Sequence, residues 1–161
     1  MSPRVERLLK KLYDSEGDYF QYEAHGKAAA EEAKGLSVKE QIELVMETAE
    51  ILSDRSAAAP HFLLVKPFSA LLRKQLPFTS EQILHLVNLG ANPPYYFPFT
   101  TILRLAESIP LTQELEQALR QMQNATVLQN GQVEGHQGIL TRIGELLRGK
   151  DTSRAFEPAG S

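Results

Sequence analysis

The sequence PFSALLR at residues 67–73 recurs in a related form, PFTTILR, at residues 98–104, which lie 31 residues further along the chain. Each copy starts with a proline, whose missing backbone N–H costs nothing in the first turn of a helix. Apolar residues then follow at helical spacing. The two copies therefore predict two helices, one opened by Pro67 and one opened by Pro98.

A second pair of related segments follows the first. LPFTSE at residues 76–81 is matched by IPLTQE at residues 109–114. In each segment a proline ends one helix, and the threonine two residues later is placed to cap the next helix through its side-chain oxygen. One repeat is therefore predicted to be a helical hairpin, over about residues 60–89 and again over about residues 95–122.

The spacing of apolar residues predicts which faces of these helices are buried. The expected stripes are Phe68, Leu71, Leu72 and Leu76; Ile83, Leu86 and Val87; Phe99, Ile102, Leu103 and Ala106; and Leu115, Ala118, Leu119 and Met122. A weaker third copy lies over residues 36–42. Because one hairpin cannot bury both of its faces, neighbouring hairpins must stack. The predicted fold class is all-α, with stacked antiparallel helical hairpins in a short α-solenoid or a helical bundle. The alternative is that any helical bundle reuses such prolines, caps and leucines.

Helices are also predicted on the N-terminal side of the hairpins. The first follows Pro3, ends from Asp14 onward and buries a stripe of Val5, Leu8, Leu9, Leu12 and Tyr13. The second covers residues 19–34 and contains Gly26, which weakens a helix. The third begins at a capping box, in which Ser37 and Glu40 satisfy each other's backbone N–H groups. Its expected buried stripe is Val38, Ile42, Val45, Met46, Ala49 and Leu52.

The C-terminal part is predicted to hold one more helix. Residues 124–135 are expected to form a polar loop, in which a short β-hairpin of Val127 and Leu128 with Val133 is conceivable. A last helix is expected over residues 136–148. We therefore predict a single all-helical domain over residues 1–148 and a flexible C-terminal tail over residues 149–161.

The segment from residue 36 to residue 122 resembles the HEAT or armadillo type of αα-repeat. The resemblance rests on the prolines at 67 and 98, on the turns PFT at 77–79 and PLT at 110–112, and on the leucine stripes. It implies an interaction scaffold that presents a curved groove to protein partners and, less often, to nucleic acid. It implies no catalytic residue.

Composition restricts the classes of partner. The formal net charge is −3, from 17 Lys and Arg against 20 Asp and Glu, so no overall field attracts phosphate backbones or anionic lipid. The absence of cysteine excludes disulfides and thiolate sites and fits a reducing compartment. No apolar run approaches the roughly 20 residues that span a bilayer. We predict a cytoplasmic protein without a membrane partner.

No motif for catalysis, a metal or a cofactor is found in the sequence. It has no Gly-rich phosphate loop and no nucleophile elbow, and its four histidines have no metal-ligand spacing. Adjacent carboxylates are typical of solvated helix surfaces. We predict no enzyme activity, no metal and no cofactor. The alternative, an active site assembled from scattered residues such as His61, His85 and Glu81, has no positive signal.

Two groups of residues are candidates for partner binding. Arg73 and Arg104 occupy equivalent repeat positions, so stacking would place them side by side on one surface. Lys66 and Lys74 would extend this basic ridge, although cations at helix ends also stabilise the helix dipole. Tyr95 and Tyr96 follow two prolines and are suited to anchor a partner or to pack a joint between hairpins. A further basic face is formed by the first helix, with Arg4, Arg7, Lys10 and Lys11.

The function predicted from these observations is a non-enzymatic protein–protein interaction or scaffold module. Such a module would be a helical segment of a larger assembly. The alternative is a nucleic-acid-binding helical-repeat protein that uses the basic ridge.

Overall fold

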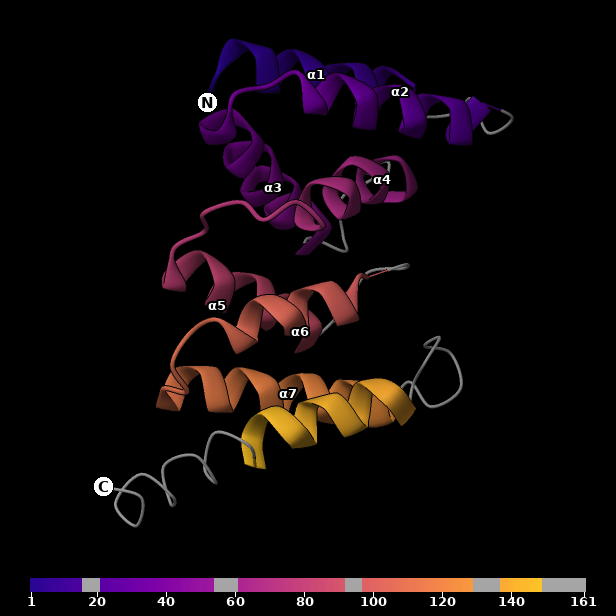
Figure 1. The fold of residues 1–161 in the computed structure, drawn as a ribbon. Helices are drawn as coiled ribbons and strands as arrows, with labels where there is room; N and C mark the ends of the chain where they lie inside the picture. Colours follow the sequence, from indigo (N-terminus) through magenta and orange to yellow (C-terminus); the bar gives the residue numbers. More distant parts are fainter. Residues whose placement is uncertain (16–20, 54–60, 92–96, 129–136, 149–161) are drawn as a thin grey trace. The chain divides into compact units, whose positions relative to one another are not determined.

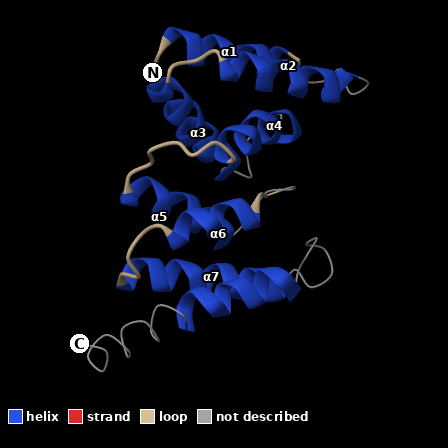
Figure 2. Cartoon of the chain, in the orientation of Figure 1, coloured by secondary structure: helices blue, strands red, loops and turns tan. Residues whose placement is uncertain are grey.

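The computed structural model describes residues 1–15, 21–53, 61–91, 97–128 and 137–148, except the side chains of residues 22, 61–65, 127 and 128. These residues form helices and contain no strand, which confirms the all-α fold class (Figure 2). Within the span that the sequence predicts as one domain, the chain divides into two compact units. Unit 1 comprises Met1–Thr79 and Pro94–Pro98, and unit 2 comprises Ser80–Pro93 and Phe99–Ser161.

Unit 1 contains four helices, α1 (Pro3–Asp14), α2 (Tyr22–Lys34), α3 (Val38–Ser53) and α4 (His61–Leu72) (Figure 1). Helix α2 packs along α4, α3 also contacts α4, and α1 lies on α2 and α3. Val5, Leu8, Leu9 and Leu12 of α1 are buried as predicted, but Tyr13 is 39% exposed. Tyr13 was wrongly included in the stripe, because it lies at the end of the helix, one residue past the last buried leucine.

Gly26 of α2 lies against the side chain of Lys66 on α4. A Cβ atom at this position would be 2.8 Å from Cγ of Lys66 on α4. Ala29 and Ala33 are buried at helical spacing from Gly26. Gly26 lowers the helix propensity of α2, but it allows the backbone of α2 to lie against the Lys66 side chain of α4 without a clash.

Pro67 does not open a helix, contrary to the prediction. It lies inside α4, which begins at residue 61. A proline in a helix interior removes one hydrogen bond, at a cost of about 3 kcal/mol. Phe68 and Leu71 are almost completely buried beside it, and each such side chain contributes about 1.5–3 kcal/mol, so packing offsets the lost hydrogen bond.

Helix α3 buries part of the predicted stripe: Val45, Ala49 and Leu52 are buried as predicted. Its buried residues are Gln41, Leu44, Val45, Thr48, Ala49 and Leu52. Val38 is 53% exposed, and Ile42 and Met46 are half-buried. The prediction was wrong for Val38, Ile42 and Met46, because the polar residues Gln41 and Thr48 take part in the buried face and interrupt the apolar pattern.

Unit 2 contains α5 (Ser80–Asn88), the 3₁₀ turn η2 (Leu89–Ala91), α6 (Phe99–Glu107) and α7 (Gln113–Leu128), followed by a helix over residues 137–148. α6 starts directly after Pro98, as predicted. Thr112 caps α7, and its Oγ1 accepts a hydrogen bond from the Leu115 backbone N–H at 3.2 Å. Every residue of the predicted stripes in α5, α6 and α7 is buried.

Helix α7 is longer than predicted. Residues 124–128 are helical, so the expected loop is wrong at its start, as is the β-hairpin through Val127 and Leu128. Ala125 and Thr126 are buried, and the Thr126 hydroxyl donates to the Met122 carbonyl at 2.8 Å. This bond satisfies a polar group that the sequence pattern indicates as solvated.

A second close approach lies within unit 2. Gly90 in η2 is buried against α7, and a Cβ atom there would be 2.7 Å from Cγ of Met122. Gly90 is therefore needed for the packing of η2 against α7. Residues 92–96 and the predicted tail over 149–161 lie outside the described residues.

Candidate functional site

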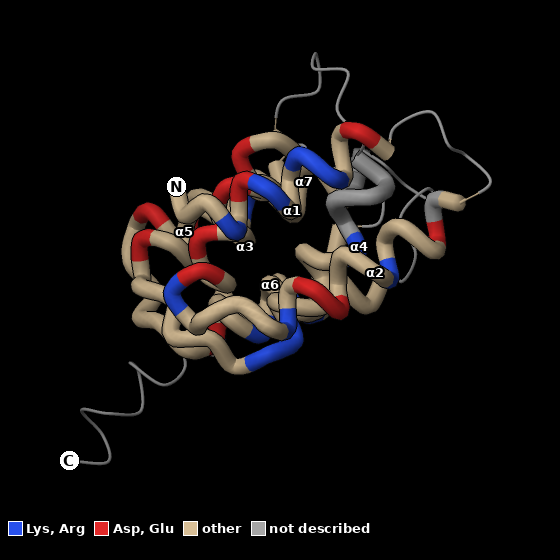
Figure 3. Tube along the Cα trace, turned by 90° about the horizontal axis from the view of Figure 1, so that it is seen from above, with Lys and Arg blue, Asp and Glu red and all other residues tan. Residues whose placement is uncertain are grey.

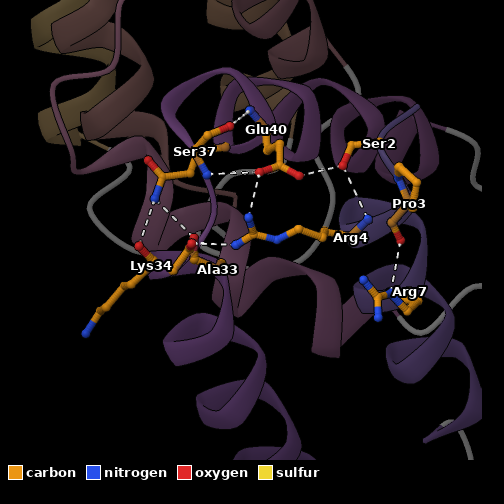
Figure 4. Close-up of polar contacts among 10 residues, drawn as sticks. Ser2, Pro3, Arg4, Arg7, Ala33, Lys34, Ser37 and Glu40 are labelled. Atoms are coloured by element: carbon orange, nitrogen blue, oxygen red, sulfur yellow. Dashed lines mark hydrogen bonds and ion pairs between the residues drawn. The ribbon is translucent and has the colours of Figure 1, made fainter.

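The N-terminus of α1 meets the turn between α2 and α3 in a network of polar side chains (Figure 4). Its centre is Glu40, in the first turn of α3. Glu40 Oε1 accepts from the Ser37 backbone N–H at 3.1 Å, and Ser37 Oγ accepts from the Glu40 N–H at 3.2 Å. The predicted capping box is confirmed.

Glu40 also binds α1. Its Oε2 accepts from the Ser2 hydroxyl at 2.5 Å, and its Oε1 lies 3.3 Å from the Arg4 guanidinium. The backbone N–H of Ser2 donates to Glu43. The Ser2 hydroxyl, the Ser37 N–H and the Arg4 charge all favour the ionised carboxylate, and they hold the pKa of Glu40 below its usual value.

Two further side chains cap the C-terminal end of α2. Gln41, which is 2% exposed, donates from Nε2 to the carbonyls of Ala33 at 3.0 Å and Lys34 at 3.4 Å. Arg4 donates to the Gly35 carbonyl at 2.5 Å. These carbonyls have no partner within the helix, so Gln41 and Arg4 join the end of α2 to α3 and α1. We call Ser2, Arg4, Ser37, Glu40 and Gln41 the Glu40 network.

A shallow pocket of about 250 Å³ lies beside this network and is lined by Arg4, Arg7, Lys11, Glu32 and Leu36. We call it the Arg7 pocket. Residues 4, 7 and 11 share one face of α1, because they are three and four residues apart, and Lys and Arg positions recur along this helix (Figure 3). Glu32 comes from α2, and Leu36 from the turn that follows it.

The charges in the Arg7 pocket are unequally compensated. Lys11 is 3.1 Å from Glu32, and Arg4 is paired with Glu40. Arg7 donates from Nε to the Pro3 carbonyl at 3.4 Å, and no carboxylate among the described residues pairs with it. The pocket therefore has one cation whose charge no neighbouring side chain neutralises.

The structure places the predicted basic residues in both units. Lys66 on α4 and Arg73 just after it are exposed in unit 1, and Arg104 on α6 is exposed in unit 2. Lys74 lies 3.5 Å, Nζ to Oε1, from Gln41 and so contacts the Glu40 network. The placement of Arg73 and Arg104 side by side on one surface stays a prediction. Tyr95 and Tyr96 lie outside the described residues.

Of the three residues of the alternative active site, the structure describes the side chains of Glu81 and His85. Glu81 and His85 are one turn apart on α5, where Glu81 is exposed and His85 is half-buried. His61 begins α4 in unit 1, and its side chain lies outside the described residues. Nothing in their placement adds support to an active site.

Sequence reasoning missed the Arg7 pocket. The signal available was the spacing of Arg4, Arg7 and Lys11 on the basic face of the first helix. The sequence could not show which cations have acidic partners, because Glu32 and Glu40 are brought to α1 by the fold of unit 1.

Among the residues that the structure describes, no three His, Asp or Glu side chains are grouped to hold a metal ion. No helix in the same residues has the length and apolar character needed to cross a membrane. Comparisons with protein-family models, with curated proteins and with solved structures find no match to the chain.

Proposed function

We propose that this chain is a non-enzymatic helical module that binds a protein partner, and that unit 1 carries a binding surface centred on Arg7. The observation that supports this proposal is the uncompensated Arg7 charge in a pocket whose other cations have acidic partners. Arginine is enriched among residues that dominate the energy of protein interfaces. Its planar guanidinium can bind an acidic group of a partner through two parallel hydrogen bonds.

The charge distribution favours a protein over nucleic acid as the partner. The chain has a net charge of −3, and the Arg7 pocket provides one free cation, whereas binding to a phosphate backbone uses several cations along a path. The cationic Arg7 pocket, in a chain whose net charge is negative, fits a local acidic feature of a protein.

The test is the binding of a captured partner to variants of Arg7. A protein retained by the tagged chain is purified, and its dissociation constant is measured with the wild type, Arg7→Gln and Lys10→Gln. We expect Arg7→Gln to weaken binding about ten- to a hundredfold, because hydrogen bonds to charged groups contribute about 1.5–3 kcal/mol. Lys10 is the control, since it is exposed on the same helix and pairs only with Asp14.

Equal dissociation constants for the wild type and Arg7→Gln would contradict the placement of the site at Arg7. In that case Arg104→Ala and a Tyr96→Ala variant test the surface predicted from the repeat. A chain that retains no protein partner at all would contradict the module itself.

Nucleic acid is the second candidate, and one observation favours it. Lys66 and Arg73 are both exposed and seven residues apart, so they share one face of α4 and its extension. Neither has a polar side-chain partner in the described chain. Binding of a short duplex that weakens steeply between about 50 and 200 mM salt would support this candidate, and the absence of binding at low salt would remove it.

A further inference from the structure

We infer that the Arg7 pocket binds a single carboxylate on a short hydrocarbon stem, as in a glutamate side chain within an acidic segment of a partner protein. This inference rests on the proposed function, because it names the chemical group by which the partner is recognised. Three features of the pocket support it: the balance of its charges, the terminal nitrogens of Arg7 and the apolar wall formed by Leu36.

The charge balance favours a group with one negative charge. Three cations and Glu32 line the pocket, Glu32 offsets Lys11, and Glu40 offsets Arg4. One positive charge, that of Arg7, is left. A monoanion neutralises it, whereas a phosphate dianion would leave a negative charge next to Glu32.

The donors of Arg7 fit a carboxylate. Its Nε is engaged by the Pro3 carbonyl, and the two terminal nitrogens have no partner in the described residues. Those nitrogens lie in one plane and bind the two oxygens of a carboxylate through parallel hydrogen bonds. A lysine at this position would supply the charge without this pair of donors.

Leu36 gives the pocket an apolar wall. Only 8% of its surface is exposed, and it lies among the charged lining residues. The hydrocarbon stem of a ligand can contact Leu36 while its carboxylate reaches Arg7. A volume of about 250 Å³ suits one side chain and excludes a folded element.

The test is a titration of the full chain with butyrate at neutral pH, followed by NMR of the Arg7 Nε–Hε group and the Leu36 methyl groups. Inorganic phosphate is titrated separately. We expect saturable shifts at both residues with butyrate and binding of phosphate at least about threefold weaker. Arg7→Gln should weaken butyrate binding about ten- to a hundredfold, Arg7→Lys should weaken it less, and Lys10→Gln should change it less than about twofold.

Unchanged butyrate binding in Arg7→Gln overturns the inference, as does phosphate binding that is as tight as butyrate binding. Circular dichroism and the thermal midpoint show that each variant is folded. The outcomes of these experiments distinguish failure of the carboxylate site from failure of the proposed function. If butyrate saturates the pocket but the chain retains no protein, the carboxylate site stands and the proposed function fails. If a protein partner binds but butyrate does not shift Arg7, the module stands and this inference fails.

Discussion

Gly26 shows how one residue without a side chain determines the packing of two helices in unit 1. A methyl group there would come within 2.8 Å of Lys66 Cγ and 3.1 Å of Lys66 Cβ. Both atoms lie near the backbone of α4, so the lysine cannot move them away easily. A substitution at Gly26 therefore has two opposing effects on stability: it raises the helix propensity of α2, and it overpacks the contact with Lys66.

We predict that Gly26→Ala lowers the free energy of unfolding by about 1–2 kcal/mol, because the overpacking cost of about 1–3 kcal/mol exceeds the gain in helix propensity of up to about 1 kcal/mol. Thermal and denaturant unfolding measure the change. Gly144→Ala is the control, since only the end of the Arg148 side chain lies near its Cβ position, and it should stabilise. Adding Lys66→Ala to Gly26→Ala should recover part of the loss. A stabilising Gly26→Ala would contradict the close approach.

Gln41 lies near the start of α3, and its side chain caps the C-terminal end of α2. We predict that Gln41→Ala destabilises the chain by about 1–3 kcal/mol, because the Lys34 carbonyl loses its side-chain donor and the Ala33 carbonyl, which also accepts from the Leu36 backbone N–H, loses one of its donors. Gln117→Ala on the exposed face of α7 should change stability by less than about 0.5 kcal/mol. Similar midpoints for the two variants in urea would show that water replaces the amide of Gln41.

At the scale of the element, Glu40 connects the start of α3 to the start of α1. The pKa of Glu40 in the folded chain is lowered from 4.5, so the unfolded chain takes up a proton more readily. The contribution of Glu40 to stability is present above a pH of about 4.5, and it is lost as the pH falls through the lower pKa of the folded chain.

The thermal midpoint of Glu40→Gln should therefore lie below that of the wild type at pH 7, and the two should converge as the pH falls below about 4.5. Glu47→Gln is a control on the same helix, because Glu47 has no hydrogen bond or ion pair in the described residues. The difference between Glu47→Gln and the wild type should stay constant over the same range. A constant difference for Glu40→Gln as well would mean that the ionised carboxylate contributes nothing to the attachment of α1.

Helices could be predicted from the sequence where apolar spacing and caps agree. Thr112 and Ser37 mark true helix starts, and the stripes of α5, α6 and α7 are buried as expected. The prediction failed where tertiary packing overrides local preference. Pro67 is inside a helix because buried neighbours offset its cost, and α3 buries the polar Gln41 because its side chain donates to carbonyls at the end of α2.

At the scale of the whole molecule, the sequence establishes the all-α class but not the division into two units. That division depends on which helices share a core, and apolar stripes alone do not specify their partners. The same reason explains why the Arg7 pocket was missed. The identity of a Lys or Arg residue does not show whether its side chain is paired with a carboxylate. Only the fold brings Glu32 and Glu40 to α1.

A chain with net negative charge that binds an acidic partner must do so through a local positive feature. We predict that the association rate of the captured partner falls as salt rises from about 50 to about 300 mM, because the Debye length shortens from about 14 to about 6 Å and screens the attraction between the two surfaces. Stopped-flow mixing measures the rate. The dissociation rate should change less with salt and more with Arg7→Gln. An association rate independent of salt would exclude an electrostatic encounter.

The pairing of Arg4 with Glu40 has an evolutionary consequence. Loss of Arg4 would remove the cation that pairs with the Glu40 carboxylate and the donor to the Gly35 carbonyl, and loss of Glu40 would leave Arg4 without a carboxylate beside Arg7. Related chains that replace one of these residues should therefore also replace the other. Positions 4 and 40 should change together in evolution, while position 7, which no carboxylate of the described residues constrains, should change only when the partner's acidic residue changes.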